Sequence, residues 1–298
     1  MRHHGWIVAV PVAALLFLAA CGTEEAPVSA SPSDPPVAVP ASDPDQTYTG
    51  LFTVLEDAEH GPQLCSMVMD SYPPQCGGPD VAGWNWDEAP DAETANGVTW
   101  GFYSVTGTWD GTTLTLTEPP LAGAATSPMV PDGVAPDFTS PCEAPAGGWA
   151  VVDAATTTQA TFDAAMAHAA AQPDFAGSWM DQSPFEVTPE NEPERMNHPE
   201  YLVLNAQFTG DLERHEAELR QLWGGALCVS EAANAMADLE AVQAELTDSV
   251  PNLAGVGVDT LTNTVSLEVF VDDGLQEELD QQYGAGVVQV TASLQPVG

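Results

Sequence analysis

The tryptophans and carboxylates that follow Cys76 are the residues whose types and spacing offer a ligand site. Trp84 and Trp86 lie two residues apart, hence on one face of an extended segment, and Asp87 and Glu88 follow directly. Aromatic faces stack on sugar rings, and neighbouring carboxylates accept hydrogen bonds from sugar hydroxyls. The four residues therefore predict a possible ligand-binding loop with sugar chemistry. The alternative is that both indoles fill the core of a small domain.

Signatures of catalysis and of metal binding are missing from the sequence. His215-Glu216 begins like the helix of zinc proteases, but Leu219 stands where the second histidine belongs. The chain has no lysine and no Gly-x-Ser-x-Gly elbow, which removes P-loop, Schiff-base and serine-hydrolase chemistry. We expect no catalytic residue, metal ion or cofactor. Calcium ligands are offered by composition alone, without a calcium-loop motif, at Asp80, Asp87, Glu88, Asp91 and Glu93.

Four of the five cysteines predict two disulfide bonds, as is typical of an exported chain. They are Cys65, Cys76, Cys142 and Cys228. Three connectivities are possible, and we prefer Cys65–Cys76, which closes a short loop, with Cys142–Cys228 as the second bond. A zinc site is the alternative, but the spacings match no zinc motif.

The charge of the chain limits its partners. It has 44 acidic residues against four basic ones and a formal net charge of −40. Such a field repels phosphate, so nucleic acids and anionic lipid headgroups are excluded as partners. The acidity serves either solubility or the binding of cations.

The N-terminal segment carries an export signal. A basic start precedes an apolar run from Trp6 to Ala20, shorter than the roughly 20 residues that a membrane span needs. The run ends in Leu18-Ala19-Ala20-Cys21-Gly22, which resembles the lipobox of bacterial lipoproteins. The resemblance implies cleavage before Cys21, acyl chains on its sulfur, and a protein anchored to the outer face of the cell membrane. The Ala-rich, lysine-free composition resembles that of actinobacterial proteins.

The composition and patterning of the mature chain predict a tether and two folded parts. A Pro-rich disordered tether is expected first, because its residues offer almost nothing to bury. The expected segments are a signal peptide (1–20), the tether (21–46), a small β-rich module (47–153), a helical and irregular connector (154–199) and an α+β domain (200–298).

The β-rich module is predicted from alternating aromatic and β-branched residues. Strands are expected over 48–55 and 98–109, with a tight turn at Asp110-Gly111 and a partner strand around 114–116. The module is expected to be a small barrel or sandwich. Its predicted core is Phe52, Val54, Trp100, Phe102, Val105, Trp109, Leu114 and Leu116.

The rest of the chain reads as helices and strands in an α+β arrangement. An Ala-rich helix is expected over 156–172 and an irregular stretch over 173–198. Residues 200–298 then give the order βαβαββαβ, with Ser230 as the N-cap of the second helix. This order predicts a ferredoxin-like α/β sandwich.

Part of this C-terminal domain is similar to known pro-domains. Val258-Asp259, Asn263-Thr264-Val265, Tyr283-Gly284 and the strand from Val288 resemble the C-terminal lobe of pro-domains in streptogrisin-type and α-lytic-type serine proteases. The resemblance implies a role as a folding chaperone or protease inhibitor.

The function that these observations favour is binding or interaction rather than catalysis. The expected protein is lipid-anchored and extracytoplasmic, with an envelope ligand or protein as its partner and an oligomeric state that the sequence leaves open. A glycan hydrolase that uses paired carboxylates is the alternative from another class, and an inhibitor of the pro-domain type is a further one.

Replacement of Cys21 tests the predicted anchor. The Cys21→Ala variant loses the only sulfur that the lipobox resemblance offers for acylation, so we expect it to appear in the culture medium rather than on membranes. Fractionation of cells that express either form measures this. Retention of the variant on membranes would count against the anchor.

Overall fold

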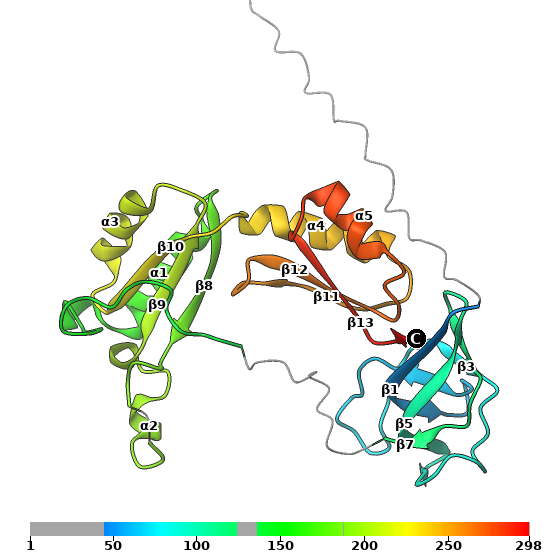
Figure 1. Ribbon diagram of the computed structural model, residues 1–298. Helices are drawn as coiled ribbons and strands as arrows, with labels where there is room; N and C mark the ends of the chain where they lie inside the picture. The colour runs from blue at the N-terminus through cyan, green and yellow to red at the C-terminus, as the bar shows by residue number, and fades with distance from the viewer. Residues whose placement is uncertain (1–44, 124–135, 187, 298) are drawn as a thin grey trace, which may run out of the picture. The chain divides into compact units, whose positions relative to one another are not determined.

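The computed structural model describes residues 45–123, 136–186 and 188–297. The protein is of the mixed α+β class that the sequence predicts, and it contains more strand than helix (Figure 1). The predicted signal peptide, Cys21 and the tether up to residue 44 lie outside the described residues. Within the described ranges, no helix is long and apolar enough to cross a membrane.

The N-terminal region forms a closed barrel of five strands. These strands are β1 (Thr47–Glu56), β2 (Gln63–Cys65), β3 (Asp80–Ala82), β5 (Val98–Trp109) and β6 (Thr113–Leu116). They follow the order β1-β2-β3-β6-β5, and β5 closes the barrel by pairing with the whole of β1, from Thr47↔Thr108 to Glu56↔Thr99. Three short strands extend the sheet: β4 (Glu93–Ala95), β7 (Leu121–Ala122) and β14 (Gln295–Pro296).

The long hairpin of the barrel forms where the sequence predicts it. Strand β5 has the predicted limits, and β6 follows after the turn at Asp110-Gly111. The Asp110 carboxylate accepts hydrogen bonds from the amides of Thr112 and Thr113, and Gly111 adopts φ 98°, which favours glycine. Local turn chemistry therefore fixes this part of the fold.

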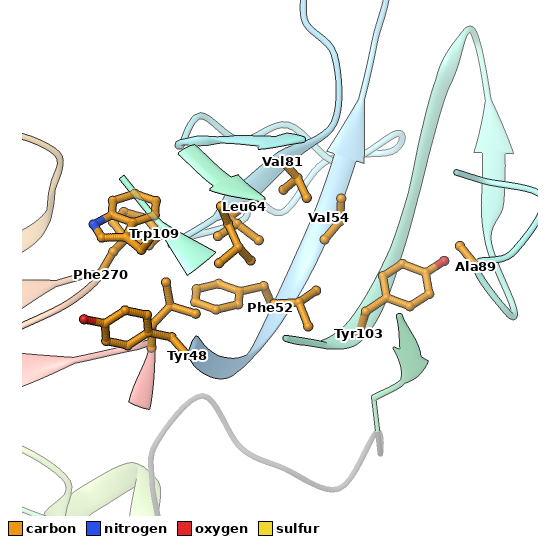
Figure 2. Packing of buried hydrophobic residues seen from close by; sticks show 12 residues of the cluster. Tyr48, Phe52, Val54, Leu64, Val81, Ala89, Tyr103, Trp109 and Phe270 are labelled. Carbon is orange, nitrogen blue, oxygen red and sulfur yellow. The ribbon is translucent and has the colours of Figure 1, made fainter. Parts of the chain in front are cut away.

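The barrel core corrects two of the predicted core residues. Tyr103 and Trp109 of β5 lie in the core with Phe52 (Figure 2). Val105 of β5 and Leu114 of β6 are buried in the same cluster. Trp100 and Phe102 were expected beside them, but both are only half-buried, because alternate residues of a strand face opposite sides. Even-numbered residues of β5 therefore belong to the outer face.

The rest of the chain contains two units with the same element order, αββαβ. Repeat 1 consists of α1 (Gln159–Ala170), β8 (Phe175–Asp181), β9 (Val203–Phe208), α3 (Leu212–Leu222) and β10 (Ala226–Glu231). Repeat 2 consists of α4 (Met236–Ser249), β11 (Leu253–Asp259), β12 (Thr264–Val269), α5 (Leu275–Tyr283) and β13 (Val288–Ala292). In each repeat the first two strands are antiparallel, and the last two are parallel.

The element order βαβαββαβ is confirmed from β9 to β13, but the ferredoxin-like sandwich is not. The strands divide between two separate sheets, β10-β9-β8 and β11-β12-β13. Strand β8 supplies the third strand of the first sheet. It lies in the stretch 173–198 that the sequence predicts to be irregular, and its pairing with β9 stabilises it.

The two repeats also match in sequence and register. Residues 173–177 read Pro-Asp-Phe-Ala-Gly, and residues 251–255 read Pro-Asn-Leu-Ala-Gly. The register shifts at the same place in both first strands, between Phe175 and Gly177 and between Leu253 and Gly255. We conclude that the two repeats are copies of one structural unit.

In each repeat the helices cover one face of the sheet (Figure 1). Leu204, Ala206 and Phe208 of β9 face the helices of repeat 1, as do the equivalent Val265, Leu267 and Val269 of β12 in repeat 2. The residues between them point to the opposite face. What covers that opposite face differs between the two repeats.

The predicted helix start at Ser230 is wrong. Strand β10 continues through Ser230, which pairs with Gln207, and α4 begins at Met236 after Ala235. The backbone of Ser230 pairs with the parallel strand β9, so Ser230 extends β10 and does not cap a helix, although serine is often found at helix N-caps.

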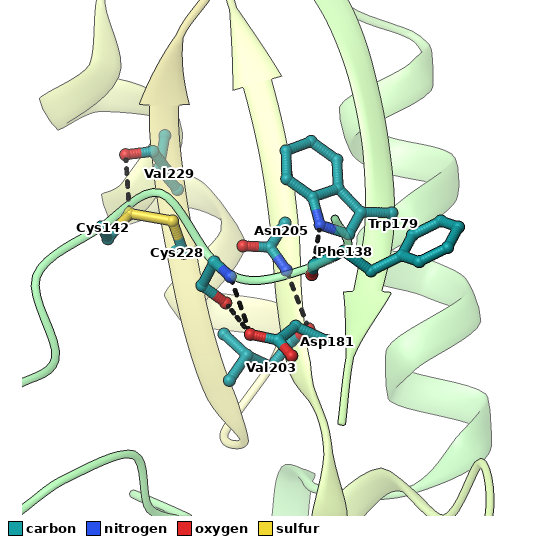
Figure 3. The surroundings of a disulfide bond; sticks show 9 residues. Phe138, Cys142, Trp179, Asp181, Val203, Asn205, Cys228 and Val229 are labelled. Carbon is teal, nitrogen blue, oxygen red and sulfur yellow. Dashed lines mark hydrogen bonds between the residues drawn. A yellow bond between two sulfur atoms is a disulfide. The ribbon is translucent and has the colours of Figure 1, made fainter. Parts of the chain in front are cut away.

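Two disulfides join the predicted partners, Cys65–Cys76 and Cys142–Cys228. The second holds residues 136–149, which we call the strap, across the face of repeat 1 opposite the helices (Figure 3). The Trp179 indole donates to the Phe138 carbonyl over 3.0 Å. Two short helical segments lie in the β8–β9 connection, α2 (Glu192–Arg195) and a 3-10 turn (Pro199–Tyr201); another 3-10 turn (Ala154–Thr156) precedes α1.

A buried carboxylate holds the strap in place. Asp181 is 2% exposed and accepts hydrogen bonds from the Ser140 amide and hydroxyl, at 2.7 and 2.8 Å, and from the Ser183 amide. Burial alone would raise the pKa of Asp181, but the hydrogen bonds from Ser183 and Ser140 outweigh burial and lower it. The ionised form is therefore the one that stabilises the fold.

Substitution of Asp181 tests this anchor. A group with a lowered pKa stabilises the folded chain above its unfolded pKa, about 3.9, and loses that contribution as the pH falls through the folded value. We expect Asp181→Asn to lower the free energy of unfolding by about 1–3 kcal/mol at pH 7 and to flatten the loss of stability below pH 4. Urea unfolding at both pH values measures this, with exposed Asp248→Asn as the control. Equal stabilities of the two variants would contradict the role of Asp181.

Candidate functional site

The structure places Trp84 and Trp86 together against the barrel core. Their rings lie 5.1 Å apart edge to face, and they contact the buried Tyr103 ring at 5.1 and 6.3 Å. Both indoles are half-buried, and that of Trp86 donates a hydrogen bond to the Glu56 carboxylate. The three rings therefore pack against one another as part of the barrel.

The predicted partners of these tryptophans point elsewhere. Asp87 and Glu88 are exposed, and Glu88 accepts a hydrogen bond from the Asn85 side chain. The segment forms turns rather than an extended strand, so the two indoles do not present one flat face together with the carboxylates. A ligand-binding role for these four residues stays a prediction.

A second group of aromatic residues lines a cavity on the outer face of the barrel. The cavity measures about 570 Å³. We call it the aromatic groove, and its lining is Thr53, Val68, Pro74, Pro90, Asp91, Glu93, Trp100, Gly101, Phe102, Ala122 and Gly123. Most of this lining is apolar, and it contains no basic residue.

The pairing of β1 with β5 builds the floor of the groove. Phe102 pairs with Thr53 and Trp100 with Leu55, so the outward side chains of the two strands lie next to each other. Gly101 lies between the two aromatic residues, and a β-carbon there would overlap the Tyr103 ring. The absence of a side chain at Gly101 therefore lets the inner and outer aromatic residues lie close to each other.

The loop closed by Cys65–Cys76 forms one wall. Val68 and Pro74 of this loop line the groove, and Tyr72 places its ring edge-on to Trp100 at 5.8 Å. Tyr72 is 76% exposed, which leaves its ring open to a ligand. The disulfide closes this segment into a short loop and so restricts the conformations that the groove wall can adopt.

Two exposed carboxylates, Asp91 and Glu93, lie at the rim. Burial raises the pKa of the nearby Tyr103 hydroxyl, and the charge of Asp91 raises it further. The groove thus combines aromatic surfaces with hydrogen-bond acceptors. This combination suits the binding of a ligand that has apolar faces and hydroxyl donors.

Known proteins offer no guide to the ligand. No protein-family model and no curated protein matches this sequence.

A polar cluster in repeat 1 is the other group of titratable side chains. His215 is 1% exposed, stacks on Phe208 at 3.7 Å and lies 2.7 Å from the Asp174 carboxylate, which also pairs with Arg214. Burial alone would raise the pKa of Asp174, but the His215 hydrogen bond, a backbone hydrogen bond and the charge of the nearby Arg214 act together to lower it. Because the imidazole is enclosed, the cluster ties α3 to the α1–β8 connection and offers no site for a substrate.

The described residues contain no group of three or more His, Cys, Asp or Glu side chains that could hold a metal ion. None of the acidic residues that the composition offers for calcium belongs to such a group.

Sequence reasoning missed the aromatic groove, although part of its signal was present. Trp100 and Phe102 have even numbers, whereas Val105 and Trp109 have odd ones. Because successive side chains of a regular strand point to opposite faces, the four could not all face the barrel core. The approach of Tyr72 to Trp100 is not visible in the sequence, because it depends on the path of the disulfide loop.

Proposed function

We propose that this chain is an extracytoplasmic binding protein, held on the membrane through lipid at Cys21, and that its aromatic groove binds a neutral glycan strand. The two disulfides support an oxidising compartment outside the cytoplasm. The lipobox resemblance supports the anchor. A tethered protein in this place meets the glycans of the cell envelope.

The observation that carries the proposal is the exposed Tyr72 ring, which packs on Trp100 next to the groove that Trp100 and Phe102 line, with Asp91 and Glu93 at the rim. The apolar face of a sugar ring stacks on aromatic side chains, and its hydroxyls donate to carboxylates. An open groove admits part of a longer polymer. The net charge of −40 favours a neutral glycan over an anionic one.

Binding accounts for the groove better than hydrolysis does. Glycoside hydrolysis requires two carboxyl groups across a bond, and the general acid has a raised pKa. Among the described residues, every Asp or Glu whose pKa shift is resolved has a lowered pKa, through hydrogen bonds that favour the charged form. The rim carboxylates Asp91 and Glu93 are exposed, whereas a general acid of this kind lies in an apolar pocket.

Substitutions in the groove test the proposal on the full chain. We expect Tyr72→Ala and Trp100→Ala each to weaken the binding of a soluble N-acetylglucosamine hexasaccharide about 3- to 10-fold, because each removes one stacking surface. Isothermal titration calorimetry measures the affinity, and thermal melting checks the fold.

Met67→Ala is the matched control. Met67 lies in the same disulfide loop and is 69% exposed, but it does not line the groove and, unlike Tyr72, it has no ring that packs on Trp100. Its affinity should equal that of the wild type. If the wild type does not bind the hexasaccharide, or if all three variants bind equally well, the groove is not a glycan site of this kind.

A further inference from the structure

The strap covers one sheet face of repeat 1. Trp179, Asn205 and Cys228 form one row across β8, β9 and β10, and this row points away from the helices. Asn205 is fully buried, and Cys228 is 1% exposed and bonded to Cys142 of the strap. The strap therefore replaces solvent on this face (Figure 3).

The equivalent row of repeat 2 is Gly257, Ser266 and Gln289, which pair across β11, β12 and β13. Gln289 is exposed and Ser266 is half-exposed. A β-carbon added at Gly257 would meet no described atom within 4 Å. The face that the strap occupies in repeat 1 is therefore open in repeat 2.

The anchor of the strap is also repeated. Asp181 ends β8 and Asp259 ends β11, and each uses its Oδ1 to accept the amide two residues ahead, Ser183 and Leu261 respectively. In repeat 1, Oδ2 of Asp181 holds the Ser140 amide and hydroxyl. In the described part of the chain, no hydrogen bond reaches Oδ2 of Asp259. Repeat 2 thus presents the same acceptor with its second oxygen free.

We propose that Gly257, Asp259, Ser266 and Gln289 form a docking face for an extended peptide segment of a partner protein. The segment lies on repeat 2 as the strap lies on repeat 1, and it offers an amide and a Ser or Thr hydroxyl to Asp259. Because Gly257 has no side chain, a side chain of the segment can occupy the space that the Trp179 indole fills in repeat 1. Because Glu268 and Asp259 border the face, a neutral or basic segment is favoured over an acidic one.

Disulfide trapping tests this register directly. Gln289 stands where repeat 1 has Cys228, so Gln289→Cys in the full chain should capture a peptide of residues 136–149 through the peptide's Cys142. The peptide carries blocked ends, and its two acidic residues, Asp137 and Glu143, are replaced by Asn and Gln. The reaction runs in a glutathione redox buffer, and intact mass measures the mixed disulfide.

The control is Gln282→Cys, which is also an exposed position, on α5 and so on the helical side of the same repeat. We expect about 10-fold more mixed disulfide at position 289 than at position 282, and a fall to the control level when Asp259→Asn is added. Asn keeps the Oδ1 acceptor, and thermal melting checks that the fold is intact. The wild-type chain gives the background from its native cysteines.

Equal trapping at positions 289 and 282, or trapping that ignores Asp259→Asn, would overturn the proposal. In chain expressed without the lipid, whose Cys21 keeps its thiol, a bond from Gln289→Cys to Cys21 of the same chain before the peptide is added would assign the face to the chain's own N-terminal segment. A bond between two chains at that stage would assign it to a second copy. Either result would overturn a partner peptide as the occupant.

Discussion

The pairing of β1 with β5 is the constraint on which the N-terminal region depends. It closes the barrel, and it fixes which side chains of both strands face inward. Phe52 and Tyr103 pair within the core, while their neighbours Thr53 and Phe102 pair on the outside. A slip of one residue would exchange these two sets and destroy both the core and the aromatic groove. The pairing of these two strands thus determines both the barrel core and the groove that we propose as the binding surface.

The repeats show how one unit acquires two different surfaces. Helices cover the same face of both sheets, and the same Asp ends the first strand of each. Repeat 1 has a buried Asn205 and a cysteine on its other face, and a covalently held strap covers them. Repeat 2 has Gly257 and Gln289 there instead, so its sheet face needs no cover to shield apolar groups. The difference between the faces lies in a few side chains, since the strands and their register agree.

Features with local causes could be predicted from the sequence. The hairpin at Asp110-Gly111, the strand 98–109 and the element order from β9 to β13 follow from turn chemistry and periodicity. The number of cysteines predicted two disulfides, and their spacing favoured the partners that form, although three connectivities were possible. Features that depend on distant pairing could not be predicted in this way. Strand β8 is stabilised by β9 across a long connection, and Tyr72 reaches Trp100 only because the Cys65–Cys76 loop folds over the barrel.

The most direct test of the aromatic groove as the ligand site is hydrogen exchange of the full chain, with and without saturating N-acetylglucosamine hexasaccharide. If the groove binds the hexasaccharide, backbone exchange slows in residues 66–75 and 90–103, which carry the groove wall, rim and floor, and exchange in both repeats is unchanged. Protection confined to the repeats, or no protection at all, would contradict the groove as the ligand site.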